Sequence, residues 1–254
     1  MKIVTSNIEQ FGTFFNVVYE VASEVVELQF FIDHLTCTFL DKSRTRFFYV
    51  NYEAKFFDEY NVDEVMSECV SIKDLFNLFK LANKSDTLTI SLDESYMYAE
   101  LESKTGSKRI FEFVLPSDFV SSPDLPSISL PAHIELETAD IKQSVKDIVL
   151  LGTDIFQFVI GDGSVTLMMD TMSDTSSYSS VKYAQVIETE TGISEQMTVR
   201  FTLSYIEQMI MFEKISKSVL IDIGEMAMMY KFEDSIMGVT VQGMIAPRII
   251  EEEE

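Results

Sequence analysis

Cysteine, proline, glycine and positive charge are all scarce in this 254-residue chain, and tryptophan is absent. The two cysteines, Cys37 and Cys69, are too few for a disulfide framework in a chain of this length, which favours a reducing compartment. No stretch approaches the ~20 uninterrupted apolar residues of a membrane span, and residues 1–15 lack the basic and then apolar order of a secretory signal. We therefore expect a soluble, intracellular protein with no membrane partner.

The shortage of positive charge limits how the chain could meet nucleic acid. Lysine and arginine number 19 against 42 aspartates and glutamates, a net charge of −23. Phosphate binding releases counterions only where a cation meets the backbone, so the average charge argues against a positive surface wrapping DNA. Basic patches interleaved with aromatics, typical of single-strand binders, are also missing. A hydrophobic fraction of 46% with 20 phenylalanines nevertheless predicts a large core.

Four segments have apolar residues at helical spacing, and the segments between them alternate with the period of strands. The helical windows are residues 8–22, 71–84, 138–149 and 203–217. Asn7, Ser71 and Thr138 stand where an N-cap is expected. Their even spacing indicates an internal repeat of one helix followed by antiparallel strands, which is an α+β fold. The predicted strands include TLTISL, YMYAELE, KRIFEFV, IFQFVI, SVTLMMD, VKYAQVIE, SVLIDI, MAMMYKF and IMGVTVQGM.

One segment interrupts this repeat. Residues 115–131 contain four of the five prolines together with five serines, so no regular element can continue through them. The sequence therefore predicts two similar domains, each holding two repeats. The predicted boundaries are 1–116 for the first domain, 117–130 for the connecting loop, 131–247 for the second domain and 248–254 for an acidic tail.

Lysines recur in three of the four helical windows. They balance the acidic residues there, so the rest of the chain carries the net negative charge. Lysines on the polar face of one helix are ordinarily a solvated surface, but recurrence in equivalent helices indicates a surface that could meet a polyanion. The candidates are Lys73, Lys80, Lys84, Lys142, Lys146, Lys214 and Lys217.

The sequence gives only weak signals for a catalytic site. His34 lies beside Asp33 with Cys37 three positions on, but an alternating run divides such side chains between two faces. His133 leaves the proline-rich segment and is expected to be exposed. Residues 161–165 form a hairpin turn rather than a phosphate loop, and the acidic clusters at 58–64 and 169–174 lack calcium-loop spacing. We expect no enzyme activity, no cofactor and no metal.

The repetition, the proline-rich connection and the ending IAPRIIEEEE together resemble the sliding clamps of the proliferating cell nuclear antigen (PCNA) family, of archaeal, eukaryotic or viral type. Three further stretches are similar to strands and helices of that family: FLDKSRTRFFYVNYEAKFFDEYNV, SIKDLFNLFKLANKSDTLTISLDE and ADIKQSVKDIVLLGTDIFQFVIGDGSVTL. The similarity spans essentially the whole chain. It departs in the first helical window, which has no lysine or arginine.

The resemblance implies a DNA polymerase processivity factor: a ring of clamp-fold domains whose helices surround double-stranded DNA without reading its sequence. The seven lysines would then face the DNA. Strand 108–115 of one chain would pair with the strand near 176–184 of the next, closing a homotrimer, with a heterotrimer as the alternative. Such a protein is cytoplasmic in archaeal or viral systems and nuclear in a eukaryote.

The resemblance also implies partners. DNA polymerase, the clamp loader, ligase and nuclease would dock short peptides into an apolar pocket, whose methionines can repack around different clients. The matching positions are Leu40, Phe47, Leu125, Ile128, Met226, Met244, Ile245, Ala246 and Pro247. A rival interpretation is an acidic, clamp-related scaffold that binds proteins and never encircles DNA.

Overall fold

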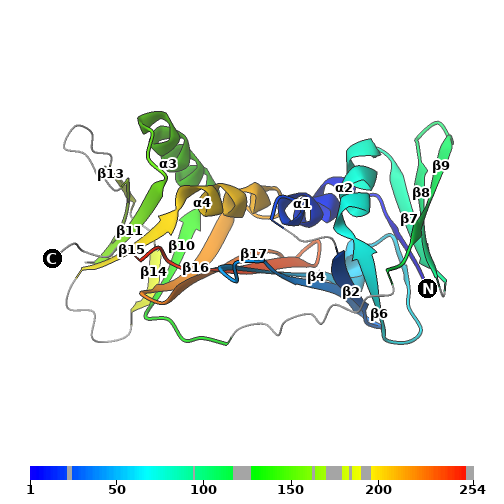
Figure 1. Cartoon of the computed structure of the whole chain (residues 1–254), viewed down its shortest axis with the longest axis horizontal. Helices are drawn as coiled ribbons and strands as arrows, with labels where there is room; N and C mark the ends of the chain where they lie inside the picture. Colours follow the sequence, from blue (N-terminus) through cyan, green and yellow to red (C-terminus); the bar gives the residue numbers. More distant parts are fainter. Residues whose placement is uncertain are drawn as a thin grey trace. The chain divides into compact units, whose positions relative to one another are not determined.

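The computed structural model describes residues 1–21, 25–93, 95–116, 127–161, 164–169, 179–182, 185–189 and 196–249. The chain forms two compact units, each with two helices above antiparallel sheet (Figure 1). The first unit comprises Met1–Leu125 with Glu233–Val241, and the second comprises Pro126–Phe232 with Gln242–Glu254. The sequence had assigned residues 233–241 to the second domain. They cluster with the first because the backbone N–H of Glu53 donates to the Gly238 carbonyl at 2.8 Å, and Lys55 Nζ donates to the Ser235 carbonyl at 2.9 Å.

The two helices of the first unit differ in how much of their surface is buried. Helix α1 (Ile8–Tyr19) is largely buried, whereas α2 (Ile72–Leu81) has one buried apolar stripe and an exposed polar one. Its strands are β1 (Lys2–Thr5), β2 (Val25–Phe30), β3 (His34–Leu40), β4 (Arg46–Glu53), β5 (Glu59–Asn61), β6 (Met66–Ser71), β7 (Thr87–Leu92), β8 (Tyr96–Glu102) and β9 (Lys108–Val114), with a 3-10 turn η1 (Ala54–Phe56).

In this unit, the strand that precedes each helix pairs with a strand of the other repeat, an arrangement called strand exchange below. β1, which precedes α1, pairs with β7, which follows α2, and β6, which precedes α2, pairs with β2, which follows α1. The resulting antiparallel orders are β5-β1-β7-β8-β9 and β4-β3-β2-β6. Because each sheet draws strands from both repeats, the repeats form one core and not two.

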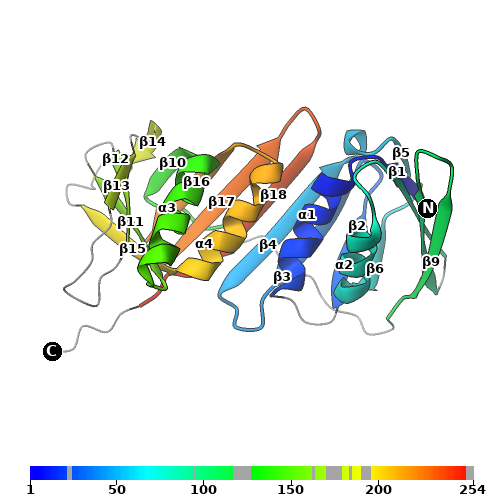
Figure 2. The same cartoon turned by 90° about the horizontal axis from the view of Figure 1, so that it is seen from above.

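Aromatic side chains fill the first core. The Phe11 ring of α1 meets Tyr52 edge to face at 5.0 Å, and the buried Tyr52 hydroxyl donates to the Phe11 carbonyl at 3.0 Å. Gly12 lets α2 approach α1 closely, since a Cβ there would lie 2.8 Å from the Phe79 ring. Figure 2 shows α1 and α2 side by side as a result.

The second unit repeats this plan. Its helices are α3 (Thr138–Leu151) and α4 (Leu203–Ile210), which continues as a 3-10 turn η2 (Met211–Lys214). β10 pairs with β16 and β15 pairs with β11, so strands again exchange between repeats. Its strands are β10 (Ala132–Glu137), β11 (Ile155–Gly161), β12 (Ser164–Met169), β13 (Ser179–Lys182), β14 (Gln185–Thr189), β15 (Met197–Thr202) and β16 (Ser218–Gly224). Two further strands, β17 (Ala227–Asp234) and β18 (Val239–Ile245), have residues in both units.

Several sequence predictions need correction. The run predicted as one strand at 181–188 contributes to two strands in different sheets, because β13 pairs with β12 whereas β14 pairs with β10. The fourth helix is shorter than its window, since its end tightens into η2. Of the proposed caps, Ser71 accepts a hydrogen bond from the Asp74 N–H at 3.3 Å, while Asn7 makes no side-chain cap and Thr138 is the first residue of its helix.

No helix in the described part of the chain has the length and apolarity that a membrane crossing requires.

Candidate functional site

Two lysines of the predicted DNA surface lie on the exposed stripe of α2. Lys73 and Lys80 are seven residues apart, so they share one side of the helix, and both are exposed. Lys80 Nζ lies 4.4 Å from the centre of the Phe76 ring, which stacks on Tyr19 at 3.9 Å. The structure gives Lys73 and Lys80 no carboxylate partner among the described residues. Their charges therefore remain available to an external anion.

Lys84 differs from this pair. It lies beyond the end of α2, and its ammonium group is 2.8 Å from Glu9 of α1, although its side chain is 80% exposed. Helix α1 carries no lysine or arginine of its own. Lys84 thus partly neutralises the acidic first turn of α1 instead of adding a fully unpaired charge.

Helix α3 carries the next two candidates. Lys142 and Lys146 are one turn apart, so they also share a side of the helix. Lys142 pairs with Glu213 of η2, whereas Lys146 is exposed and has no ion-pair partner among the described residues. The charge of Lys142 is therefore partly neutralised by Glu213, whereas that of Lys146 is not neutralised by any described residue.

The prediction that Lys214 and Lys217 lie on the fourth helix is wrong. Lys214 ends η2, and Lys217 follows it just before β16 (Ser218–Gly224). Both side chains are exposed. The Lys217 carbonyl accepts hydrogen bonds from the backbone and hydroxyl of Thr138, each at 2.8 Å, which ties this segment to the start of α3.

Both strands predicted to join neighbouring copies are at sheet edges. β9 (Lys108–Val114) ends the order β5-β1-β7-β8-β9, and β13 (Ser179–Lys182) ends the order β13-β12-β11-β15. Residues 176–178 and 183–184 of the predicted partner strand lie outside the described residues. On β9, Ile110 and Val114 are each 69% exposed. An edge strand with exposed apolar side chains is open to further pairing.

The end of α3 carries a second exposed apolar group. Val149, Leu150 and Leu151 are 47%, 84% and 45% exposed. These three adjacent aliphatic residues form an exposed apolar patch at the end of the helix. The run IVLL before Gly152 is the sequence signal for this patch, and none of its residues is among the predicted site residues.

The predicted client-pocket residues fall in both units and differ in exposure. Phe47 and Ile245 are each only 2% exposed, so their side chains support the surface and cannot contact a peptide without displacement. Met226 and Ile128 are 75% and 37% exposed. Leu40, Met244, Ala246 and Pro247 are half-buried, and Leu125 lies outside the described residues.

The segment after β18 is held by Arg248. Its backbone N–H donates to the Arg200 carbonyl at 2.7 Å, and its guanidinium pairs with Asp154 at 2.7 Å. The chain therefore remains anchored to the second unit at a residue that the sequence assigned to a solvated tail. Residues 250–254, the rest of that tail, lie outside the described residues.

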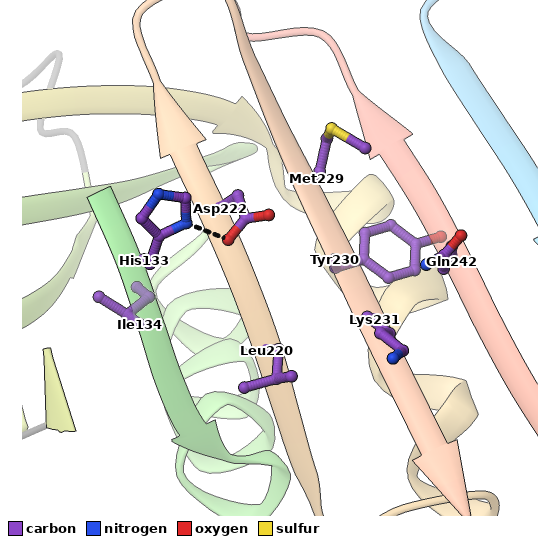
Figure 3. A pocket seen from close by; sticks show the side chains of 8 residues that line it. All are labelled: His133, Ile134, Leu220, Asp222, Met229, Tyr230, Lys231 and Gln242. Atoms are coloured by element: carbon purple, nitrogen blue, oxygen red, sulfur yellow. Dashed lines mark hydrogen bonds and ion pairs between the residues drawn. The ribbon is translucent and has the colours of Figure 1, made fainter. Parts of the chain in front are cut away.

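The second unit has a pocket of about 340 Å³ on its sheet, with His133 and Asp222 at one end and Lys231 at the other (Figure 3). His133 lies on β10, and its Nδ1 is 2.6 Å from Asp222 Oδ1. The expectation was an exposed residue, whereas the side chain is 37% exposed and paired. The pocket is lined by His133, Ile134, Leu220, Asp222, Met229, Tyr230, Lys231 and Gln242. None of the predicted client residues is among them.

His34, Asp33 and Cys37 do not form a catalytic cluster. His34 Nδ1 is 2.6 Å from Asp33 Oδ1, and the His34 carbonyl accepts from the Tyr60 hydroxyl at 2.6 Å. Cys37 is buried, and that burial, with the nearby Glu27 carboxylate, raises the pKa of its thiol. A protonated, inaccessible thiol is a poor nucleophile, so these residues do not make a His–Cys pair.

The loop between β3 and β4 was missed by the functional interpretation of the sequence. Asp41 begins it, is 3% exposed, and accepts hydrogen bonds from the Ser43 hydroxyl at 2.6 Å and the Thr45 N–H at 2.7 Å. Burial alone would raise the carboxyl pKa, but these bonds and the Arg46 N–H together lower it. An aspartate with serine two residues on and threonine four residues on was the signal for this turn.

Comparison with known proteins gives a consistent result, although no family-wide sequence model matches the chain. "DNA polymerase sliding clamp 3" of Sulfurisphaera tokodaii is 24% identical over 229 residues, 88% of this chain and 89% of that protein. "DNA polymerase sliding clamp" of Methanosarcina barkeri is 25% identical over 76% of each. The fold matches the crystal structure of a PCNA2–PCNA3 complex from Sulfolobus tokodaii with a TM-score of 0.82, at 23% identity, covering 98% of this chain and 99% of that one. In fold, and in sequence over most of its length, the chain is similar to the sliding clamps of the PCNA family.

Proposed function

We propose that this chain is a subunit of a sliding clamp, a ring that encircles duplex DNA and tethers replication and repair enzymes to it. The observation that carries the proposal is the coincidence of two features: a clamp fold over nearly the whole chain, and lysines on α2 and α3 that have no ion-pair partner in the described part of this acidic molecule. Lys73, Lys80 and Lys146 would contact phosphates, with Lys84, Lys142, Lys214 and Lys217 contributing weaker or partly neutralised charge.

Tethering needs no bond chemistry. A client enzyme that docks on a ring around its template has a raised local concentration there, so its dissociation no longer ends synthesis. Phosphate contacts carry no sequence information, and the ring can therefore move along the duplex at little energetic cost. The exposed Met226 and Ile128 supply adaptable apolar contacts for polymerase, ligase, nuclease and clamp-loader peptides.

Ring closure would use the sheet edges. β9 of one copy would add to β13 of the next, and Ile110 and Val114 would be shielded from water at that edge. A head-to-tail interface of this kind closes into a ring when its rotation permits, and a homotrimer is the proposed assembly. A heteromeric ring is the second candidate, because the similar structure named above is a complex of PCNA2 with PCNA3.

Light scattering on the purified chain tests the assembly. A mass near three chains supports the homotrimer, whereas a lone monomer contradicts it and favours the heteromeric ring. Ile110→Asp should lower the assembled mass by charging the β9 edge. The matched control is Ile236→Asp, because Ile236 is 89% exposed in the turn after β17 and is not at a sheet edge.

The DNA surface is tested with the Lys80→Glu and Lys146→Glu double variant. We expect it to lose retention on closed circular DNA and stimulation of a polymerase while its assembled mass is unchanged. The salt dependence should also weaken, since the slope of log affinity against log salt falls by about 0.9 for each phosphate that the protein no longer neutralises.

A charge-matched control separates phosphate binding from general repulsion. Lys2→Glu with Lys55→Glu makes the same change in net charge at lysines paired with Glu59 and Glu53 outside the helices. This control should retain DNA. Equal losses in both double variants, or normal retention after the helix reversal, would contradict the proposed DNA surface and favour the scaffold that does not enclose DNA.

A further inference from the structure

The loop joining β3 and β4 carries two exposed cations that lie two residues apart. Asp41 and Arg46 form an ion pair at 3.1 Å, so their charges cancel. The net positive charge of the loop therefore comes from Lys42 and Arg44. Both are exposed, and neither has an ion-pair partner among the described residues. The chain has 42 acidic residues, and some lysines outside the helices pair with carboxylates: Lys2 pairs with Glu59, and Lys108 pairs with Glu100 and Glu102. Lys104, in the β8–β9 turn, has no ion-pair partner among the described residues, but it has no second cation beside it in its turn.

The backbone of this loop is fixed before any partner arrives. The buried Asp41 carboxylate accepts hydrogen bonds from the Ser43 hydroxyl, from the N–H and hydroxyl of Thr45, and from the N–H, Nε and Nη2 of Arg46. The Arg44 N–H donates to the Asp41 carbonyl at 2.9 Å, and the Asp41 N–H donates to the Arg46 carbonyl at 3.0 Å. Figure 2 shows the loop extending beyond the ends of β3 and β4.

The conformation of Arg44 adds an independent argument. Its φ is 56°, and it is the only non-glycine residue with positive φ in the part of the chain that the structure describes. Glycine adopts this left-handed conformation without a Cβ penalty, so arginine here costs folding free energy. Strain of this kind is typical of sites where the side chain has a use outside the fold. The exposed guanidinium of Arg44 makes no ion pair or hydrogen bond with any described residue, so the fold itself does not explain why arginine stands here.

We propose that Lys42 and Arg44 form a preorganised site for carboxylates of an acidic peptide segment in a partner protein. This goes beyond the proposed tethering, and it rests on that function only in taking the partners to be its clients. Arginine binds a carboxylate through two parallel N–H groups, and a flexible lysine beside it accepts a second acid. The fixed loop reduces the entropy lost on binding. The acidic surroundings would repel such a peptide elsewhere and so direct it to this loop.

Carbodiimide coupling of an acidic peptide to the full chain tests the proposal, because it captures weak binding as amides between peptide carboxylates and lysine amines. The probe is an isotope-labelled (Ser-Glu)4 peptide with both ends blocked, and adducts are mapped by mass spectrometry. Lys104 is the internal reference, since it is an exposed lysine in the β8–β9 turn without an ion-pair partner among the described residues. We expect the yield at Lys42 to exceed that at Lys104 by about tenfold at low salt, and to fall toward it as salt screens the attraction.

Two variants separate a formed site from charge alone. Arg44→Gly keeps the backbone conformation and removes one cation, so the Lys42 yield should fall severalfold. Asp41→Asn makes the loop more positive but releases its backbone, so preorganisation predicts a fall whereas simple charge attraction predicts a rise. A yield at Lys42 equal to that at Lys104, or a rise in the Asp41→Asn variant, would overturn the proposal.

The same variants distinguish this proposal from the DNA surface. Lys42→Ser with Arg44→Gly should retain closed circular DNA, and Lys80→Glu with Lys146→Glu should couple the peptide normally. Loss of DNA by the loop variant, together with suppression of coupling by a short duplex, would assign the loop to nucleic acid and overturn the acidic-peptide site. Normal coupling in a chain that never retains DNA would leave this site standing and remove the clamp function instead.

Discussion

Replacing Asp41 by asparagine is the sharpest test of how the first unit is held together. The substitution keeps the shape but removes the charge and turns one acceptor oxygen into a donor that faces other donors. The Asp41 side chain is 2% exposed and that of its partner Arg46 is 13% exposed, so solvent cannot replace the missing hydrogen bonds. Removing one member of a buried ion pair costs about 3–5 kcal/mol. The loop can open locally while the rest of the unit stays folded, and this opening limits the cost. We expect Asp41→Asn to lower the free energy of unfolding by about 2–4 kcal/mol.

The pH dependence gives a second signature. Because folding lowers the Asp41 pKa, its contribution to stability is present above the unfolded value near 3.8 and is lost as pH falls through the folded value. The difference in stability between wild type and Asp41→Asn should therefore be constant near neutral pH and shrink below about pH 4.

Urea unfolding followed by circular dichroism at pH 7 and at several lower pH values measures both effects. If the two units unfold in separate transitions, the change belongs to the first. Asp93→Asn is the control: Asp93 also accepts backbone hydrogen bonds, from Ser95 at 3.0 Å and Tyr96 at 2.9 Å, but in an exposed turn, so a much smaller change is expected. A loss below about 0.5 kcal/mol for Asp41→Asn would refute the argument from burial and hydrogen bonding.

Three further substitutions test other interactions. Gly243→Ala should lower the melting temperature, with a loss of about 2–3 kcal/mol, because the new Cβ would lie 2.1 Å from the ring of the buried Tyr230; an unchanged melt would mean that the ring can move. Arg44→Gly should raise the free energy of urea unfolding by about 1 kcal/mol by relieving the positive φ, and a loss would show that the side chain stabilises the fold. Tyr52→Phe should cost about 1 kcal/mol and accelerate exchange of nearby amide hydrogens, since it removes the bond to the Phe11 carbonyl; equal exchange would contradict that bond's role.

Local periodicity was enough to locate the four helices and several of the strands, although β1–β6, β10 and β15 were not among the predicted runs. The predicted helix windows begin at residues 8, 71, 138 and 203, and the helices begin at Ile8, Ile72, Thr138 and Leu203. The run KRIFEFV is β9 from end to end, because alternation of apolar and polar residues is a property of the strand itself. The similarity to sliding clamps was likewise visible from the order of such segments.

What depends on distant residues could not be predicted. The lysine candidates came from helix windows, but whether a lysine is available depends on partners such as Glu9 for Lys84 and Glu213 for Lys142, which lie far away in the sequence. The burial of Phe47 and Ile245 reflects packing that no local pattern contains. The exchange of strands between repeats was invisible for the same reason, since register is set by the partner strand.

That exchange governs how each unit must form. β1 cannot meet β7, nor β10 meet β16, until almost a whole unit has left the ribosome, and closing such long loops costs entropy and slows folding. A half-unit would be left with strands lacking neighbours and with an uncovered apolar face, conditions that lead to aggregation. The pair of repeats, and not the single repeat, is therefore the smallest piece that selection could have duplicated or that a biochemist could hope to purify.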